Sequence, residues 1–420
     1  MRFFSLFYNL YSRQKTLFGY STATITNSVS GMFCGLVIIG WVPPEDLGLW
    51  KSLLILQSYA SIFQGGIRSG LNRELPFRIG SGDYSQVRQL TSTTQAFSIA
   101  TLIFLLLAAV FCFVFFSSSK IRFALFAVLY VAALSIYSNF LLVTYRAKQQ
   151  FALLTKFQFI FAFSNLATLP IVYSLGFFGI PFRVFFISSI QAFLLHLYRP
   201  IKVPSVFRLE PFLSLAKVGI PLFITGYLIQ VSLTFPNTTL LIRHGTSMVG
   251  LFVPSMAIFS LMTLVPKSIG QYVYSKMNYR LGKTGDFLAL WRYALKSSMG
   301  LLSVSIPFII FVSYLFPVFI RAYYPKYNEC TDSIPWITIA GALFGSQVFL
   351  SALYSMKAWK NILHYTVFRL ISAFCLPFLF LLMLDSKPLL AVSIGYAIAG
   401  LFCFLFGILL TYRSTHFRLL

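Results

Sequence analysis

A row of polar side chains runs through the otherwise apolar segment from residue 49 to 72. Three carboxamides, one hydroxyl and one guanidinium make up this row, in the order Gln57, Ser61, Gln64, Arg68 and Asn72. Spacings of three and four residues place all of them on one face of a helix. Because polar groups without partners are costly in lipid, we expect this face to line a water-filled cavity.

A second row recurs later in the chain, with Ser260, Thr263, Lys267 and Gln271. Each row carries one cation. Arginine can hold phosphate oxygens in a bidentate fork, lysine can neutralise them, and amides can exchange hydrogen bonds with sugar hydroxyls. These rows predict a site for an anionic, sugar-bearing substrate. The expected binding residues, including amides of the first and seventh apolar segments, are Arg68, Lys267, Gln57, Gln64, Asn72, Asn27, Gln230, Asn237 and Gln271.

The same residue types also have a structural interpretation. Arg68 and Lys267 could extend their long side chains to lipid headgroups. Asn27, Asn72 and Asn237 could join neighbouring helices by hydrogen bonds. The sequence leaves both interpretations open.

Signatures of catalysis are missing from the sequence. The four histidines (His196, His244, His364 and His416) lie near the ends of expected helices, so no Ser/His/Asp or Cys/His set can be proposed. The five cysteines lack metal-ligand spacing, and the chain has no G-x-x-x-x-G-K-[ST] loop and no nucleic-acid-binding motif. We therefore predict no enzyme, no catalytic or metal-binding residues, no cofactor and no nucleic-acid partner.

The acidic residues are few and lie at turns, in linkers or at helix ends. They are Glu45, Asp46, Glu74, Asp83, Glu210, Asp286, Glu329, Asp332 and Asp385. A cation- or proton-coupled drug exporter usually needs a carboxylate at membrane depth. Coupling of transport to protons, to sodium or to neither stays open.

The composition is that of an integral membrane protein. Of 420 residues, 58% are hydrophobic and 10% are charged, whereas soluble domains carry roughly 25% charged residues. Counting the apolar segments that are long enough to cross a bilayer predicts an all-α fold with about twelve transmembrane helices. These segments are residues 19–42, 49–72, 93–117, 122–145, 155–176, 179–198, 218–242, 248–272, 297–320, 334–356, 366–384 and 388–411.

An internal repeat relates the two halves of the chain. Residues 48–83 align with 250–286, and residues 155–163 align with 366–374. The first alignment contains the identities Gly48/Gly250, Leu49/Leu251, Ser58/Ser260, Ile67/Ile269, Arg78/Arg280 and Gly80/Gly282. Internal repeats of this kind are common in membrane transporters.

The repeat predicts two parallel six-helix bundles, residues 1–204 and 205–420, because an even number of spans leaves both halves pointing the same way. Most of the 33 lysines and arginines lie on the side of the N-terminus, Arg369 among them, and few lie on the other side, Arg183 among them. By the positive-inside rule both termini are expected in the cytoplasm.

Several short runs resemble Wzx-type O-antigen flippases, in the polysaccharide transporter branch of the multidrug/oligosaccharidyl-lipid/polysaccharide (MOP) exporter superfamily. In the first half these runs are Glu45-Asp-Leu-Gly-Leu-Trp50, Gly70-Leu-Asn-Arg-Glu-Leu75 and Gly80-Ser-Gly-Asp83. In the second half they are Lys217-Val-Gly-Ile-Pro221, Gly250-Leu-Phe252 and Arg280-Leu-Gly282. The resemblance extends over the whole chain in span number, repeat and loop length.

The resemblance implies a V-shaped pair of six-helix bundles whose lumen opens alternately to the inner and to the outer side of the membrane. The implied activity is translocation of an undecaprenyl-pyrophosphate-linked oligosaccharide across the bacterial inner membrane for lipopolysaccharide biosynthesis and polysaccharide export. Implied partners are the lipid-linked oligosaccharide, membrane lipids, and a polysaccharide polymerase with its chain-length machinery. No family motif covers Arg68 or Lys267, so their assignment to the pyrophosphate rests on the two polar rows alone.

Other functions remain open. A multidrug exporter or a peptidoglycan-precursor flippase of the same superfamily would share the fold. A membrane polysaccharide polymerase or ligase would use a similar lipid-linked sugar, but such enzymes usually carry a large outer loop. The longest outer segment here, residues 321–333, is short.

Overall fold

The chain folds into two compact helical units. The computed structural model describes residues 2–284 and 286–416, without the side chains of residues 2–18, residue 21 and several positions between 265 and 287. The described residues contain helices and turns but no strand, which confirms the all-α class. Unit 1 comprises Met1–Val42 and Leu56–Tyr227, and unit 2 comprises Pro43–Ile55 and Leu228–Leu420. The helices α2 and α9 therefore each contribute residues to both units.

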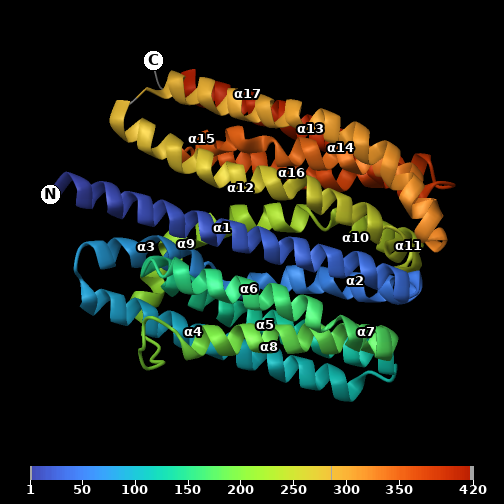
Figure 1. The fold of residues 1–420 in the computed structure, drawn as a ribbon, viewed down its shortest axis with the longest axis horizontal. Coiled ribbons are helices and arrows are strands. Elements are labelled where there is room, and N and C mark those ends of the chain that lie inside the picture. Colours follow the sequence, from blue (N-terminus) through green and yellow to red (C-terminus); the bar gives the residue numbers. More distant parts are fainter. Residues whose placement is uncertain (1, 285, 417–420) are drawn as a thin grey trace. The chain divides into compact units, whose positions relative to one another are not determined.

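Unit 1 is built from helices that run alongside one another, with α1 against α6, and α5 against both α4 and α8 (Figure 1). The elements with residues in it are α1 (Arg2–Trp41), α2 (Pro44–Ala60), η1 (Ser61–Gln64), α3 (Ile67–Gly80), α4 (Tyr84–Phe115), α5 (Ser119–Ala147), α6 (Phe151–Ala167), α7 (Leu169–Leu175), η2 (Gly176–Phe178), α8 (Gly179–Leu197) and α9 (Leu209–Ser232). Apolar side chains of α3, α4, α5, α6, α8 and α9 form a large buried cluster in it.

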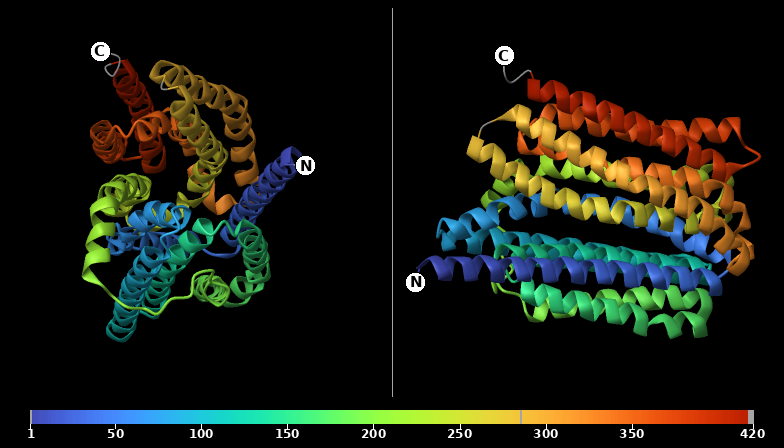
Figure 2. Two further views of the ribbon diagram at one scale, coloured as in Figure 1. Left: turned by 90° about the vertical axis from the view of Figure 1, so that its left-hand side faces the viewer. Right: turned by 45° about the horizontal axis from the view of Figure 1, so that its top comes forward.

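In unit 2, α14 and α16 pack against α17. The orange and red ribbons of these helices lie side by side in both views of Figure 2. Beyond its parts of α2 and α9 it contains α10 (Phe235–His244), α11 (Thr246–Leu251), α12 (Val253–Thr284), α13 (Phe287–Tyr323), η3 (Pro325–Ser333), α14 (Ile334–Gly345), η4 (Gln347–Phe349), α15 (Leu350–Ser355), α16 (Trp359–Met383) and α17 (Pro388–His416). Its main buried cluster joins α12, α13, α14, α15, α16 and α17.

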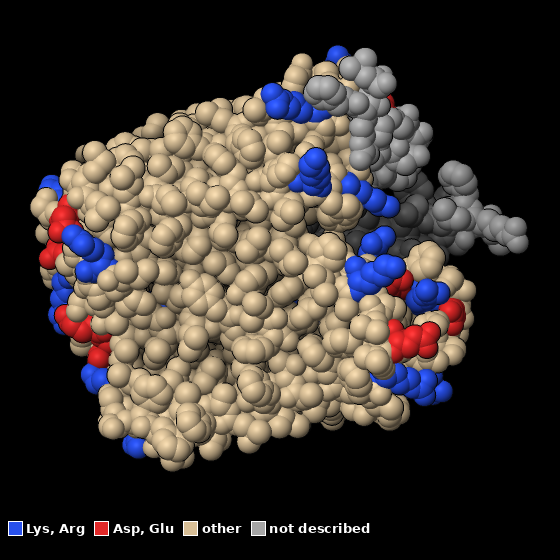
Figure 3. Space-filling view, turned by 180° about the vertical axis from the view of Figure 1, so that it is seen from behind, with Lys and Arg blue, Asp and Glu red and all other residues tan. Residues whose placement is uncertain are grey.

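The helices have the length and polarity of membrane spans. In the described part of the chain, nine helical stretches are long and apolar enough to cross a bilayer. On the face in Figure 3, lysines, arginines and acidic residues gather toward the helix ends and leave a broad uncharged surface between them. A charge-free band of this kind suits contact with lipid acyl chains. The protein is therefore a multi-pass membrane protein.

The predicted helix 49–72 is interrupted. Helix α2 ends at Ala60, a 3-10 turn follows, and Gly65 and Gly66 adopt φ angles of 56° and 78° before α3 begins. Glycine tolerates this left-handed conformation without steric cost. A Cβ on Gly66 would also lie 2.8 Å from the backbone nitrogen of Ile220 on α9. The prediction of one continuous helical face from Gln57 to Asn72 is wrong, because the chain unwinds here to let α3 and α9 approach.

Two glycines that the repeat aligns touch each other within unit 2. A Cβ on Gly48 of α2 would lie 1.9 Å from the carbonyl oxygen of Thr246, and a Cβ on Gly250 of α11 would lie 1.8 Å from that of Pro44. Only a residue without a side chain permits this backbone contact. This close backbone contact explains why both repeats carry glycine at the aligned position.

Candidate functional site

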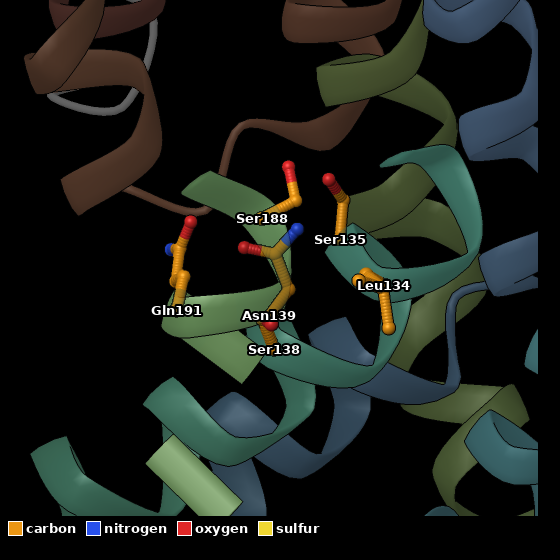
Figure 4. A pocket seen from close by; sticks show the side chains of 6 residues that line it. All are labelled: Leu134, Ser135, Ser138, Asn139, Ser188 and Gln191. Atoms are coloured by element: carbon orange, nitrogen blue, oxygen red, sulfur yellow. The ribbon is translucent and has the colours of Figure 1, made fainter. Parts of the chain in front are cut away.

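A small polar pocket lies between α5 and α8 in unit 1 (Figure 4). It has a volume of about 50 Å³ and is lined by Leu134, Ser135, Ser138, Asn139, Ser188 and Gln191. Among the residues that the structure describes, none of these five polar side chains has a hydrogen-bond partner. Polar groups in a membrane protein rarely stay unpaired, so hydroxyls and amides in this arrangement are suited to a polar ligand or ordered water.

The local sequence explains why these side chains converge. Ser135, Ser138 and Asn139 follow helical spacings of three and four residues and therefore share a face of α5. Ser188 and Gln191 are three residues apart on α8, which packs along α5. The α5–α8 contact thus creates the pocket from two faces that are polar within apolar helices.

Two arginines come together in unit 1, and neither has an acidic partner among the described residues. Arg68 lies in the first turn of α3, Arg146 lies in the last turn of α5, and α3 packs against α5, so the two positive charges lie near each other. Over the described parts of the chain, neither side chain forms a hydrogen bond or an ion pair. Like charges held close without a counter-ion favour binding of an anion, and two guanidinium forks match phosphate oxygens. Arg68 and Arg146 are called the arginine pair below.

A connected amide network joins three helices of unit 1. The Nδ2 of Asn27 on α1 donates to Oε1 of Gln158 on α6 over 2.8 Å, and Nδ2 of Asn165 donates to Oδ1 of Asn27 over 3.0 Å. Arg183 of α8 donates to the hydroxyl of Thr168 and to Asn165, each over 3.1 Å. Asn27 thus makes hydrogen bonds between helices, as the structural interpretation expects. Arg183, counted from the sequence among the charges of the outer side, is buried.

A single buried arginine forms the centre of unit 2. Arg369 of α16 is 6% exposed and donates from Nε to the Ser232 hydroxyl over 2.9 Å and from Nη1 to Oε1 of Gln347 over 3.3 Å. Its guanidinium carbon lies 4.4 Å from the centre of the Phe344 ring, and Tyr365 also donates to Gln347. No ion pair joins Arg369 to an acidic residue in the described part of the chain. From the sequence, Arg369 counts as a basic residue of the cytoplasmic side, whereas in the structure its side chain is buried within α16.

The repeat gives this arginine a counterpart in unit 1. The alignment of residues 155–163 with 366–374 pairs Arg369 with Gln158. Gln158 bonds Asn27 of α1, just as Arg369 bonds Ser232 of α9. At one of the two equivalent positions a neutral amide is therefore enough to join the two helices by a hydrogen bond. The positive charge of Arg369 is not required for a bond of this kind.

The remaining predicted residues lie in both units, and their role in binding stays a prediction. In unit 1, Gln57 of α2 is partly buried, Gln64 of η1 is buried with no partner for Oε1 within the described residues, and Asn72 of α3 is exposed. In unit 2, Gln230 of α9 is exposed and Asn237 of α10 is partly buried. The side chains of Lys267 and Gln271 lie outside the described residues.

Sequence reasoning missed the polar pocket, Arg146 and the true position of Arg369. The signal for the pocket was present in the spacing of Ser135, Ser138 and Asn139 within the apolar segment 122–145. No comparable pattern indicated the burial of Arg369, because the positive-inside rule counts a basic residue near the start of an apolar run as a charge on the cytoplasmic side.

Comparisons with known proteins bear on the fold. No family model matches the sequence, and no curated protein matches it. Among solved structures, an inward-facing multidrug resistance MATE family transporter of the MOP superfamily matches with a TM-score of 0.72 and 14% identity, over 94% of this chain and 95% of the other. An outward-facing structure described in the same words matches with a TM-score of 0.65 and 14% identity, over 96% of both chains. A MATE structure in the straight conformation gives 0.61 and 15% identity, over 96% of both chains. The chain therefore has the fold of the MATE transporters of the MOP superfamily.

Proposed function

We propose that this protein is a flippase of the Wzx type. It moves an undecaprenyl-pyrophosphate-linked oligosaccharide, an O-antigen or related surface-polysaccharide repeat unit, across a bacterial inner membrane by alternating access. The observation that supports the proposal is the arrangement along α5. This helix contributes Arg146 to the arginine pair and three side chains to the polar pocket, and none of these groups has a partner among the described residues.

The spacing along α5 fits the two ends of such a substrate. Asn139 and Arg146 are seven residues apart, so they lie on the same face about 10 Å from each other along the axis. The arginine pair would bind the pyrophosphate, and the hydroxyls and amides of the polar pocket would bind sugar hydroxyls. Lys267 stays a predicted ligand of the same pyrophosphate.

The distribution of charge favours an anionic substrate over a cationic drug. Arg183 and Arg369 are buried, whereas acidic residues occupy helix starts, caps and turns, such as Glu210 in the first turn of α9 and Asp286 as the N-cap of α13. Glu74, inside α3, faces Arg78 at 4.0 Å. A drug exporter remains the second candidate because the structural neighbours are multidrug transporters. Among the described residues, however, no carboxylate lies buried within a long apolar helix, where such an exporter usually carries one.

Deletion of the gene in the organism that makes the polysaccharide tests the proposal. Complete lipid-linked repeat units should accumulate on the inner leaflet, and surface polymer should disappear. If single repeat units reached the surface without being polymerised, the protein would be a polymerase or ligase and the flippase proposal would fall.

The deletion strain also tests the arginine pair. Arg68→Gln should restore export roughly 10-fold less well than the parent chain, since hydrogen bonds from a charged group contribute about 1.5–3 kcal/mol. Arg78→Gln is the matched control, because Arg78 lies on the same helix but is paired with Glu74 and Asp83. Equal export by both variants at equal membrane levels would remove Arg68 from the binding site.

The orientation is part of the proposal. With both termini in the cytoplasm, a reporter fused after Lys326 should be accessible from outside and one fused after Lys283 from inside. Arg183 and Arg369 no longer count in this argument because both are buried. The opposite accessibility of the two fusions would reverse the orientation.

A further inference from the structure

An aromatic groove opens on unit 1 where α4 ends and α5 and α8 begin. Its volume is about 660 Å³, and its walls include Phe113, Phe123, Phe126, Phe178, Phe182 and Phe185. Several of these side chains are open at the surface, Phe182 being 56% exposed. The rings pack edge to face at the mouth, with the centroids of Phe113 and Phe123 5.2 Å apart. An apolar groove exposed on a membrane-spanning unit will be filled by an apolar chain.

Two cations stand at the rim of this groove. The guanidinium carbon of Arg122 lies 5.1 Å from the centre of the Phe113 ring and 6.0 Å from that of Phe123. The Nζ of Lys120 lies 5.5 Å from the centre of the Phe177 ring. The Nε of Arg122 is buried without a hydrogen-bond partner among the described residues. The rings hold the positive charge of Arg122 at the rim, and its guanidinium group has no hydrogen-bond acceptor among the described residues, so its charge is available to an anion.

The aromatic groove is distinct from the site of the proposed flippase activity. Arg122 and Arg146 lie near opposite ends of α5, about 36 Å apart along the helix axis, which is about the thickness of a bilayer core. Between the groove and the polar pocket, Tyr130 of α5 is hydrogen-bonded to Ser189 of α8 over 2.8 Å. The groove therefore belongs to the headgroup level on the side of the membrane away from the arginine pair.

We infer that the aromatic groove binds an anionic phospholipid of the surrounding bilayer. One acyl chain lies between the phenylalanine rings, and the phosphate accepts hydrogen bonds from Arg122 with Lys120 adding positive charge. A phospholipid is favoured over the polyprenyl carrier because a site open to the bilayer fills by mass action with the matching lipid that is most abundant there. A zwitterionic lipid would fit the apolar walls but gain less from the two cations.

Native mass spectrometry of the full chain, purified with equal amounts of phosphatidylglycerol and phosphatidylethanolamine, tests this inference. The parent protein should retain phosphatidylglycerol preferentially. Arg122→Gln should lower its apparent affinity about fivefold, the usual effect of one basic side chain near an anionic lipid. Phe182→Ala should reduce retention of both lipids because it shortens the apolar wall.

Matched controls come from unit 2. Arg292→Gln and Phe311→Ala each change an exposed residue of α13 and should leave lipid retention unchanged. Equal phosphatidylglycerol retention by Arg122→Gln and Arg292→Gln would overturn the inference, as would equal retention of the two lipids by the parent protein. Displacement of phosphatidylglycerol by equimolar undecaprenyl phosphate would reassign the groove to the carrier lipid. None of these outcomes depends on whether the protein transports an oligosaccharide.

Discussion

Replacing Arg369 by glutamine is expected to leave the protein folded while lowering transport roughly 10- to 100-fold. The repeat places Gln158 at the equivalent position of unit 1, where an amide bonds the neighbouring helix. A glutamine at 369 can in the same way bond Ser232 and Gln347. What disappears is a buried positive charge that has no acidic partner in the part of the chain that the structure describes. Such charges in membrane proteins are retained for function more often than for stability.

Two measurements separate function from folding at Arg369. The midpoint of thermal unfolding in detergent should be unchanged or higher for Arg369→Gln, because a desolvated charge has been removed. Export should fall in the same variant and recover in part in Arg369→Lys, which keeps the charge but loses the planar fork. Normal export by Arg369→Gln, or failure of that variant to fold, would make the arginine a structural residue.

Replacing Gly250 by alanine is expected to destabilise the fold by about 2–3 kcal/mol or more. The added methyl would lie 1.8 Å from the carbonyl oxygen of Pro44. Backbone atoms cannot move aside as a flexible side chain can, so α2 and α11 must separate. The change should appear as a lower midpoint of thermal unfolding and a lower yield of folded protein.

Gly300→Ala is the matched control for this prediction. Gly300 lies inside α13, and a Cβ there would meet no atom of the described residues within 4 Å. Alanine is favoured over glycine in a helix by about 1 kcal/mol, so this variant should be as stable as the parent or more so. If the two variants shifted the unfolding midpoint equally, the α2–α11 glycine contact would not be a source of stability.

The sequence by itself determined the class of the protein and the identity of most helices. Long apolar runs in a chain with 10% charged residues have few alternatives to membrane helices, because backbone groups in lipid must be paired within a helix. All twelve expected segments coincide with helices of the structure, although several, such as 49–72 and 218–242, are divided between two or more helices. The shared glycine at positions 48 and 250 was also visible, since identity at aligned positions does not depend on the fold.

Only the tertiary structure decided which polar residues meet. Helical spacing predicts the direction of a side chain only while the helix continues, and Gly65 and Gly66 interrupt it between Gln57 and Asn72. The α5–α8 contact created the polar pocket, and the α3–α5 contact brought Arg68 to Arg146. The burial of Arg369 depended on Ser232 and Gln347 from other helices. Contacts between residues far apart in the chain carry no local periodic signal, so a single sequence cannot show them.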